Sequence, residues 1–170
     1  MSHILYLVRH GIAEVNSTAG DADRQLTDEG VRKFQQAALG LKRLGVEPDV
    51  VLSSPLRRAE ETARLLVKTL APKVAVELFQ PLAPGHPPED VLQALRPFRR
   101  AQQVVMVGHQ PDLGELASQL LTGSTTLALL PFRKGGVAAI ALSAIPPRET
   151  GTLQWFVTPK QLRWMAGKAG

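Results

Sequence analysis

Three short segments of this 170-residue chain place arginine or histidine directly after an apolar run. The first contains Arg9 and His10 after I-L-Y-L-V, the second is S-P-L-R-R-A with Arg58, and the third is V-G-H-Q-P with His109. An arginine fork contacts two phosphate oxygens at once and keeps its charge at any working pH. A neutral imidazole can attack phosphorus directly. These residue types suit phosphoryl transfer, which depends on positioning and electrostatic stabilisation.

Apolar runs alternate with amphipathic stretches along the chain, and this alternation predicts where those segments lie. The predicted strands are 4–8, 49–54, 74–79, 103–109, 136–142 and 152–157. The predicted helices follow Thr27 as far as Gly45, cover 58–70, run from Pro88 to about Leu95 and from Leu113 to Leu121, and begin again after Pro159. This order predicts an α/β fold with a mostly parallel sheet covered by helices, in a single domain over residues 1–170.

Parallel strands end at the same edge of a sheet, and ligands of α/β folds bind at that edge. Arg9 and His10 follow the first predicted strand, Arg58 the second and His109 the fourth. We therefore expect these four residues to lie close together, where they would bind the oxygens of one phosphoryl group.

The composition is typical of a soluble globular protein, with 44% hydrophobic and 21% charged residues. The absence of cysteine excludes disulfides and thiolate chemistry. The longest weakly polar stretch, 135–145, is shorter than the roughly 20 residues that span a bilayer. Because the first residues do not resemble a secretory signal either, we expect a cytoplasmic protein without membrane association.

Basic residues outnumber acidic ones, 20 against 15, and the excess lies in residues 62–170. Two explanations stay open: a solvated basic surface, or a surface that binds an anionic ligand or an acidic protein. Nucleic acid is not expected, because the sequence has no dense stripe of Lys and Arg and only 5% aromatic residues on which bases could stack.

Four longer motifs contain the same segments. They are R-H-G-I-A (9–13), R-Q-L-T-D-E-G (24–30), S-P-L-R-R-A-E-E-T-A (54–63) and V-G-H-Q-P-D-L (107–113). In this order they resemble the histidine phosphatase superfamily, and within it the SixA-type phosphohistidine phosphatases. L-A-P-G (82–85) and the stretch 151–162 extend the resemblance to nearly the whole chain. It implies the phosphoglycerate-mutase-like fold, in which helices lie on both sides of a mostly parallel, mixed sheet.

The resemblance also implies a role for each residue that matches a motif. His10 corresponds to the nucleophile, Arg9 and Arg58 to two arginines that clamp the phosphate, and His109 to a second histidine that contacts the phosphoryl oxygens. Asn16 lies where mutase-like members have a phosphate-contacting asparagine. No metal and no other cofactor is expected.

Two further features concern the substrate. Ser54 could offer its hydroxyl to phosphate, although a serine before proline is also an ordinary turn residue. Ester-cleaving members of the superfamily have a carboxylic acid that protonates the leaving alcohol, and Glu77, Glu89 and Asp90 are the candidates here. None of the three is clearly placed for this role, and SixA-type members likewise lack an obvious acid.

The sequence thus predicts a metal-independent phosphatase that removes phosphate from phosphohistidine through a phospho-His10 intermediate. By resemblance, its partner is a phosphohistidine-bearing protein such as a phosphotransfer domain or a phosphocarrier. One alternative is a phosphomonoesterase acting on small metabolites or on phosphoserine and phosphothreonine. Another is a non-catalytic phosphate-binding module, against which the presence of both His10 and His109 argues. The sequence does not indicate an oligomeric state.

Overall fold

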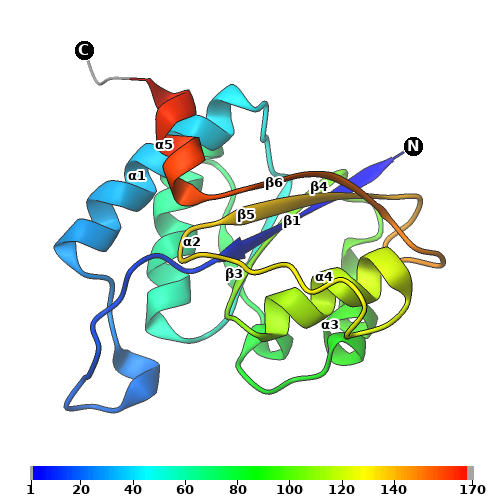
Figure 1. Cartoon of the computed structure of the whole chain (residues 1–170), viewed down its shortest axis with the longest axis horizontal. Helices are drawn as coiled ribbons and strands as arrows, with labels where there is room; N and C mark the ends of the chain where they lie inside the picture. The colour runs from blue at the N-terminus through cyan, green and yellow to red at the C-terminus, as the bar shows by residue number, and fades with distance from the viewer. Residues whose placement is uncertain (1, 168–170) are drawn as a thin grey trace.

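A six-stranded sheet forms the centre of the computed structural model, which describes residues 2–167 (Figure 1). The strands are β1 (His3–Arg9), β2 (Val50–Ser53), β3 (Val76–Leu78), β4 (Gln103–Gly108), β5 (Val137–Leu142) and β6 (Thr152–Val157). Their order across the sheet is β3-β2-β4-β1-β5-β6. The first four are parallel, whereas β5 runs antiparallel to both β1 and β6. The predicted mostly parallel, mixed sheet is confirmed.

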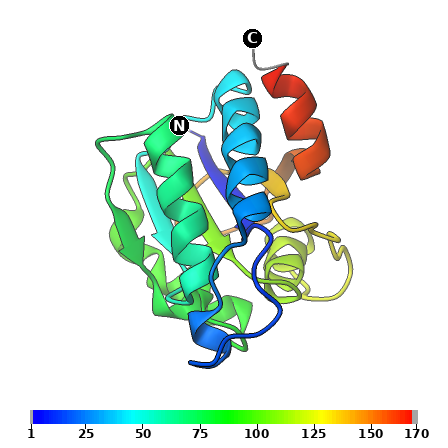
Figure 2. The same cartoon turned by 90° about the vertical axis from the view of Figure 1, so that its left-hand side faces the viewer.

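Helices cover both faces of this sheet, which confirms the three-layer arrangement (Figures 1 and 2). They are α1 (Asp28–Arg43), α2 (Arg57–Leu70), α3 (Pro88–Ala94), α4 (Asp112–Thr122) and α5 (Pro159–Ala166). Helices α1, α2 and α5 pack on one face, and α3 and α4 pack on the other. Within residues 2–167, no helix combines the length and apolar character needed to cross a membrane.

The interior of strand β1, residues 4–8, is apolar because both faces of the strand are buried. Leu5 and Leu7 pack in the core beneath α3 and α4, and Tyr6 and Val8 pack in the core beneath α1, α2 and α5. Since β1 lies between β4 and β5, it is held on both edges as well. It is therefore a rigid support for the residues that follow it.

The strand register brings the predicted site residues to the same edge of the sheet. Arg9 of β1 pairs with Gly108 of β4, so His10 and His109 leave neighbouring strands together. Ser53 of β2 pairs with Val107 of β4, so the chain leaves β2 beside them and enters α2. The meeting of the three segments at the carboxyl edge of the sheet is thus a direct consequence of parallel pairing.

Most predicted boundaries agree with the structure to within one or two residues. Thr27 caps α1 as expected, and its hydroxyl accepts a hydrogen bond from the Gly30 N–H at 2.9 Å. Gly45, the predicted end of that helix, has a φ of 76°, which glycine adopts without strain. Strand β3 is shorter than predicted, since only three residues pair at this exposed edge. Three short 3₁₀ turns were not predicted: η1 (Asp21–Asp23), η2 (Gln80–Leu82) and η3 (Arg96–Phe98).

Candidate active site

The structure brings the four predicted site residues together at the carboxyl edge of the sheet. The rings of His10 and His109 lie with their centroids 5.2 Å apart and their planes tilted by 51°. His10, His109 and Arg58 are only 5%, 4% and 6% exposed, and Arg9 is half-buried. Two imidazoles and two guanidinium groups thus form one buried, polar cluster, which we call the cradle.

The ring of His10 is held in one orientation and one tautomer. Its Nδ1 atom lies 2.7 Å from the carbonyl oxygen of Gly11. Because a carbonyl can only accept, Nδ1 must bear the proton, and the lone pair of the neutral ring is then on Nε2. The pKa of His10 is lowered to about 4, mainly by burial and also by the charges of Arg58, Arg9 and Lys134, while the bond to Gly11 opposes the shift. At neutral pH His10 is therefore an uncharged imidazole whose free lone pair is on Nε2.

His109 is oriented by Ser54. Its Nε2 atom lies 2.7 Å from the Ser54 hydroxyl, which accepts a hydrogen bond from the Leu56 N–H at 3.2 Å and can donate its own proton to Nε2, so that Nδ1 bears the ring proton. Burial lowers the pKa of His109 to about 3, and the neighbouring His10 and Arg58 act in the same direction. Its buried Nδ1 atom has no partner within residues 2–167. The Ser54 hydroxyl thus contacts His109, and its contact with phosphate stays a prediction.

Thr62 connects the end of β1 to α2. Its fully buried hydroxyl accepts a hydrogen bond from the Gly11 N–H at 3.0 Å and donates one to the Arg58 carbonyl oxygen at 2.7 Å. The peptide group after His10 is thus fixed to the helix turn from which Arg58 projects. Sequence reasoning did not assign Thr62, even though it is the threonine of the S-P-L-R-R-A-E-E-T-A motif.

The two arginines are only partly satisfied by protein groups. Arg9 donates from Nη1 to the Phe132 carbonyl oxygen at 2.8 Å, and Arg58 donates from Nη1 to the Asp21 carbonyl oxygen at 2.9 Å. In both side chains Nε is buried and has no partner among the described residues. A buried N–H without an acceptor is costly, and buried polar groups are nearly always paired. Both arginines therefore keep a donor that an oxyanion could use.

Asp21 is a part of the site that sequence reasoning missed. Its Oδ2 atom lies 3.2 Å from Nη2 of Arg58, and its Oδ1 atom lies 2.8 Å from Nη1 of Arg24. Although slight burial opposes ionisation, these two cations hold the pKa of Asp21 below its usual value. Asp21 is therefore the anion that partly neutralises Arg58 here, and an entering oxyanion must share the guanidinium with it.

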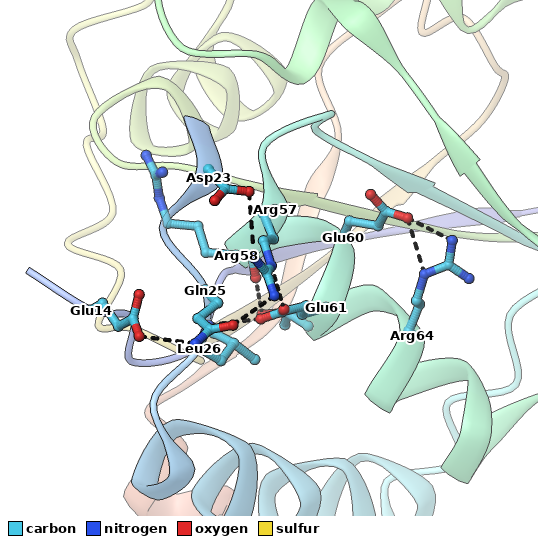
Figure 3. Close-up of polar contacts among 10 residues, drawn as sticks. Glu14, Asp23, Gln25, Leu26, Arg57, Arg58, Glu60, Glu61 and Arg64 are labelled. Atoms are coloured by element: carbon cyan, nitrogen blue, oxygen red, sulfur yellow. Dashed lines mark hydrogen bonds and ion pairs between the residues drawn. The ribbon is translucent and has the colours of Figure 1, made fainter. Parts of the chain in front are cut away.

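The loop that holds Asp21 is anchored by charged residues of α2 (Figure 3). Arg57 reaches Gln25 Oε1 at 2.6 Å, Glu61 Oε1 at 2.9 Å and Asp23 Oδ1 at 3.4 Å. Glu61 in turn accepts a hydrogen bond from the Leu26 N–H at 2.7 Å. Arg57 is an exposed residue of the first turn of α2, and these contacts hold the loop that contains Asp21 against that helix.

The remaining predicted residues lie farther from the cradle. Asn16 is exposed on the loop after β1, and within residues 2–167 no hydrogen bond links its side chain to the cradle. Glu77 lies exposed in the edge strand β3. Glu89 and Asp90 are exposed in the first turn of α3, where Asp90 Oδ2 lies 3.4 Å from His86 Nδ1.

Comparisons with known proteins agree with this geometry. Residues 5–82 match the model of the histidine phosphatase superfamily (branch 1). The chain is 38% identical over 164 residues to an uncharacterized protein of Picosynechococcus, covering 93% of this chain and 98% of that protein. It is 30% identical over 162 residues to the phosphohistidine phosphatase SixA of Escherichia coli, covering 94% of this chain and 96% of that protein. A solved structure of the protein histidine phosphatase SixA complexed with tungstate superposes with a TM-score of 0.83 at 27% identity, covering 94% and 99% of the two chains.

Replacing Thr62 tests whether the cradle depends on its hydroxyl. Thr62→Val keeps the shape of the side chain but leaves the buried Gly11 N–H without an acceptor, which costs about 1–3 kcal/mol. We expect urea unfolding to show a free energy of unfolding lower by this amount. We also expect calorimetry to show weaker binding of tungstate, which serves as an oxyanion probe. Thr62→Ser, which keeps the hydroxyl, is the control and should retain tungstate binding. Equal tungstate affinity in Thr62→Val and wild type would contradict the positioning role.

The lowered pKa values of the two histidines predict loss of stability in acid. In the unfolded chain both imidazoles take up a proton below pH about 6.5, whereas in the folded chain they resist until about pH 4 and 3. Because the unfolded state then binds more protons, the free energy of unfolding falls with pH, by up to about 2 kcal/mol per histidine at pH about 5. We expect His10→Gln and His109→Gln each to reduce this fall. Urea titrations at pH about 7.5 give the reference, and parallel stability curves for wild type and both variants would refute the prediction.

Proposed function

The chain belongs to the histidine phosphatase superfamily, in its SixA-type branch, and is a phosphatase of that superfamily; on this premise we propose that it hydrolyses phosphohistidine on a protein. One observation supports this proposal most strongly. It is a buried, neutral His10 whose Nε2 lone pair faces a site bordered by two arginines and a second histidine. The reaction then proceeds in two steps through phospho-His10 and needs no metal.

In the first step, Nε2 of His10 attacks the phosphorus of the substrate. The substrate imidazole enters with a proton on the ring nitrogen that does not bear phosphorus. A new P–N bond forms to His10, the P–N bond to the substrate imidazole breaks, and that imidazole leaves as a neutral ring that keeps its proton. Arg9 and Arg58 stabilise the charge that spreads over the phosphoryl oxygens, and His109 donates a hydrogen bond to them. Nε of both arginines and Nδ1 of His109 have no partner among residues 2–167, and these groups are the available donors.

In the second step, water attacks the phosphorus of phospho-His10. A P–O bond forms, the P–N bond to His10 breaks, and inorganic phosphate leaves while the lone pair returns to Nε2. The hydrogen bond from Nδ1 to the Gly11 carbonyl stays in place through both steps. It keeps the ring oriented and lets the same tautomer start the next cycle.

The placement of the three carboxylates considered from the sequence supports phosphohistidine over a phosphate ester. An alkoxide leaves poorly without a general acid, which contributes about 10²–10⁴ in rate. An imidazole leaves readily once it is protonated, so it depends less on such an acid. Glu77, Glu89 and Asp90 are all exposed, and none of them lines the two cavities next to the cradle that the described residues form. The partner we propose is a phosphotransfer domain or a phosphocarrier protein.

A phosphomonoesterase is the second candidate, and two residues that sequence reasoning did not assign favour it. His86 and Asp112 line a small cavity together with His109. The Asp112 carboxylate is fixed there by a hydrogen bond from the Gly85 N–H at 2.9 Å. Either side chain could give a proton to a leaving alcohol on that side of the cradle.

A competition assay distinguishes the two candidates. A phosphohistidine-bearing phosphotransfer domain competes with a phosphoserine peptide and a sugar phosphate in the presence of a chelator. We expect kcat/KM to be at least about 100-fold higher for the phosphohistidine protein, since only the ester needs the general acid. Asp112→Asn is the matched variant, because it removes the acid and leaves the cradle residues in place. A preference for the esters, or loss of all activity in chelator, would overturn the proposal.

A further inference from the structure

A second cavity, of about 390 Å³, lies directly beside the cradle on the side of α1 and α5. In Figure 2, α1 and α5 stand next to each other and the segment before β5 passes close to them. Arg9 and Gly11, the two neighbours of His10 in the chain, both line this cavity. A ligand in the cavity would therefore lie next to a phosphoryl group on His10. We call it the α1–α5 cavity.

The wall of the α1–α5 cavity is basic, and most of its charge is not neutralised. Lys33, Arg133, Lys134 and Arg163 all line it. Lys33 forms an ion pair with Glu29 at 2.5 Å, whereas within residues 2–167 the other three have no ion-pair partner within 4.0 Å. A recess lined by positive charges focuses the electrostatic field and attracts anions.

The floor of the cavity is apolar. Ile12 from the loop after β1, Phe34 from α1 and Pro159 from α5 line it. Gly30 also contributes, and a Cβ there would lie 2.1 Å from the Ile12 carbonyl oxygen, so the loop and the helix are in direct contact. The cavity thus suits a group that combines an anionic head with an apolar body.

The basic segment is joined to the catalytic strand by backbone hydrogen bonds. The Gly135 N–H lies 3.0 Å from the carbonyl oxygens of both Arg9 and His10. Gly135 has a φ of 83°, which lets the chain turn sharply after Arg133 and Lys134. Lys134 is close enough for its charge to help lower the pKa of His10, after the larger effect of burial. The cavity and the cradle are therefore parts of one surface.

We propose that the α1–α5 cavity binds an acidic side chain and its apolar neighbour on the phosphohistidine-bearing protein, and so selects that protein as substrate. This inference rests on the proposed function. Arg133 and Lys134 are exposed at the rim, where they can meet a protein surface as well as a small molecule. Because like charges line the recess, a substrate with a carboxylate beside its phosphohistidine associates faster and binds more tightly than one with an amide.

Paired phosphohistidine peptides test this inference. The two peptides of a pair differ at one position near the phosphohistidine, which is glutamate in one peptide and glutamine in the other. An apolar residue stands next to this position. From one pair to the next, the position lies at a different distance from the phosphohistidine. For at least one pair we expect wild type to show kcat/KM about tenfold higher for the glutamate peptide, falling in about 0.5 M salt because the charges are then screened. The double variant Arg133→Gln/Arg163→Gln should lower the ratio towards one.

The control is the double variant Arg99→Gln/Arg100→Gln. These exposed arginines precede β4, so they lie at the opposite edge of the sheet and change the net charge equally without touching the cavity. We expect this variant to keep the wild-type ratio. A lowered ratio in the control as well would show a general charge effect and overturn the proposed site.

The remaining outcomes distinguish failure of the proposed cavity from failure of the proposed phosphohistidine phosphatase activity. Equal hydrolysis of both peptides in every pair by wild type would overturn the acidic-residue site and leave the phosphohistidine phosphatase standing. Hydrolysis of no peptide and no protein substrate would overturn the proposed function and this inference with it. If free N-acetylglutamate accelerates hydrolysis of the glutamine peptide, the cavity is a small-molecule effector site and the inference fails. Competition by N-acetylglutamate against the glutamate peptide alone would support it.

Discussion

The two backbone polar groups of Gly11 hold the candidate site together. Its carbonyl oxygen accepts the Nδ1 proton of His10, and the N–H of the same residue donates to Thr62 on α2. One residue thereby fixes the tautomer of the proposed nucleophile and its position relative to Arg58. The parallel register of β1, β4 and β2 brings the segments together, but the hydrogen bonds of Gly11 and Thr62 set the orientation of the groups that react.

The cradle also buries positively charged groups whose hydrogen-bond donors are only partly satisfied. Arg9 and Arg58 each keep a buried Nε without a partner among the described residues, and both histidines are uncharged because burial lowers their pKa values. Such an arrangement is unfavourable for stability and favourable for a phosphoryl group, which supplies the missing negative charge. Asp21 meets part of this need by contacting Arg58 from a loop that α2 anchors. The basic α1–α5 cavity extends the same electrostatic preference to the surface around the site.

The sequence was sufficient to predict the residues that follow strands. Arg9, His10 and His109 lie at the ends of apolar runs and Arg58 follows one within a few residues, and the geometry of parallel sheets brings such positions to one edge. Asp21 and the α1–α5 cavity could not be predicted in this way. They depend on contacts between segments distant in the chain, such as Asp21 with Arg58 and the Gly135 N–H with the carbonyl oxygens of Arg9 and His10, for which hydrophobic periodicity has no signal. Thr62 could be predicted only in part. The sequence motif contains it, but only the structure shows its two hydrogen bonds.

The position of phosphate on the His10 ring is the most direct test of the mechanism. The protein is mixed with a phosphohistidine substrate, quenched at alkaline pH, and examined by phosphorus NMR and by mass spectrometry of its peptides. Because Nδ1 donates to the Gly11 carbonyl, we expect an acid-labile phosphate on Nε2 of His10 that forms and decays during turnover. Phosphate on Nδ1, phosphate on another residue, or turnover without a phosphoenzyme would contradict it.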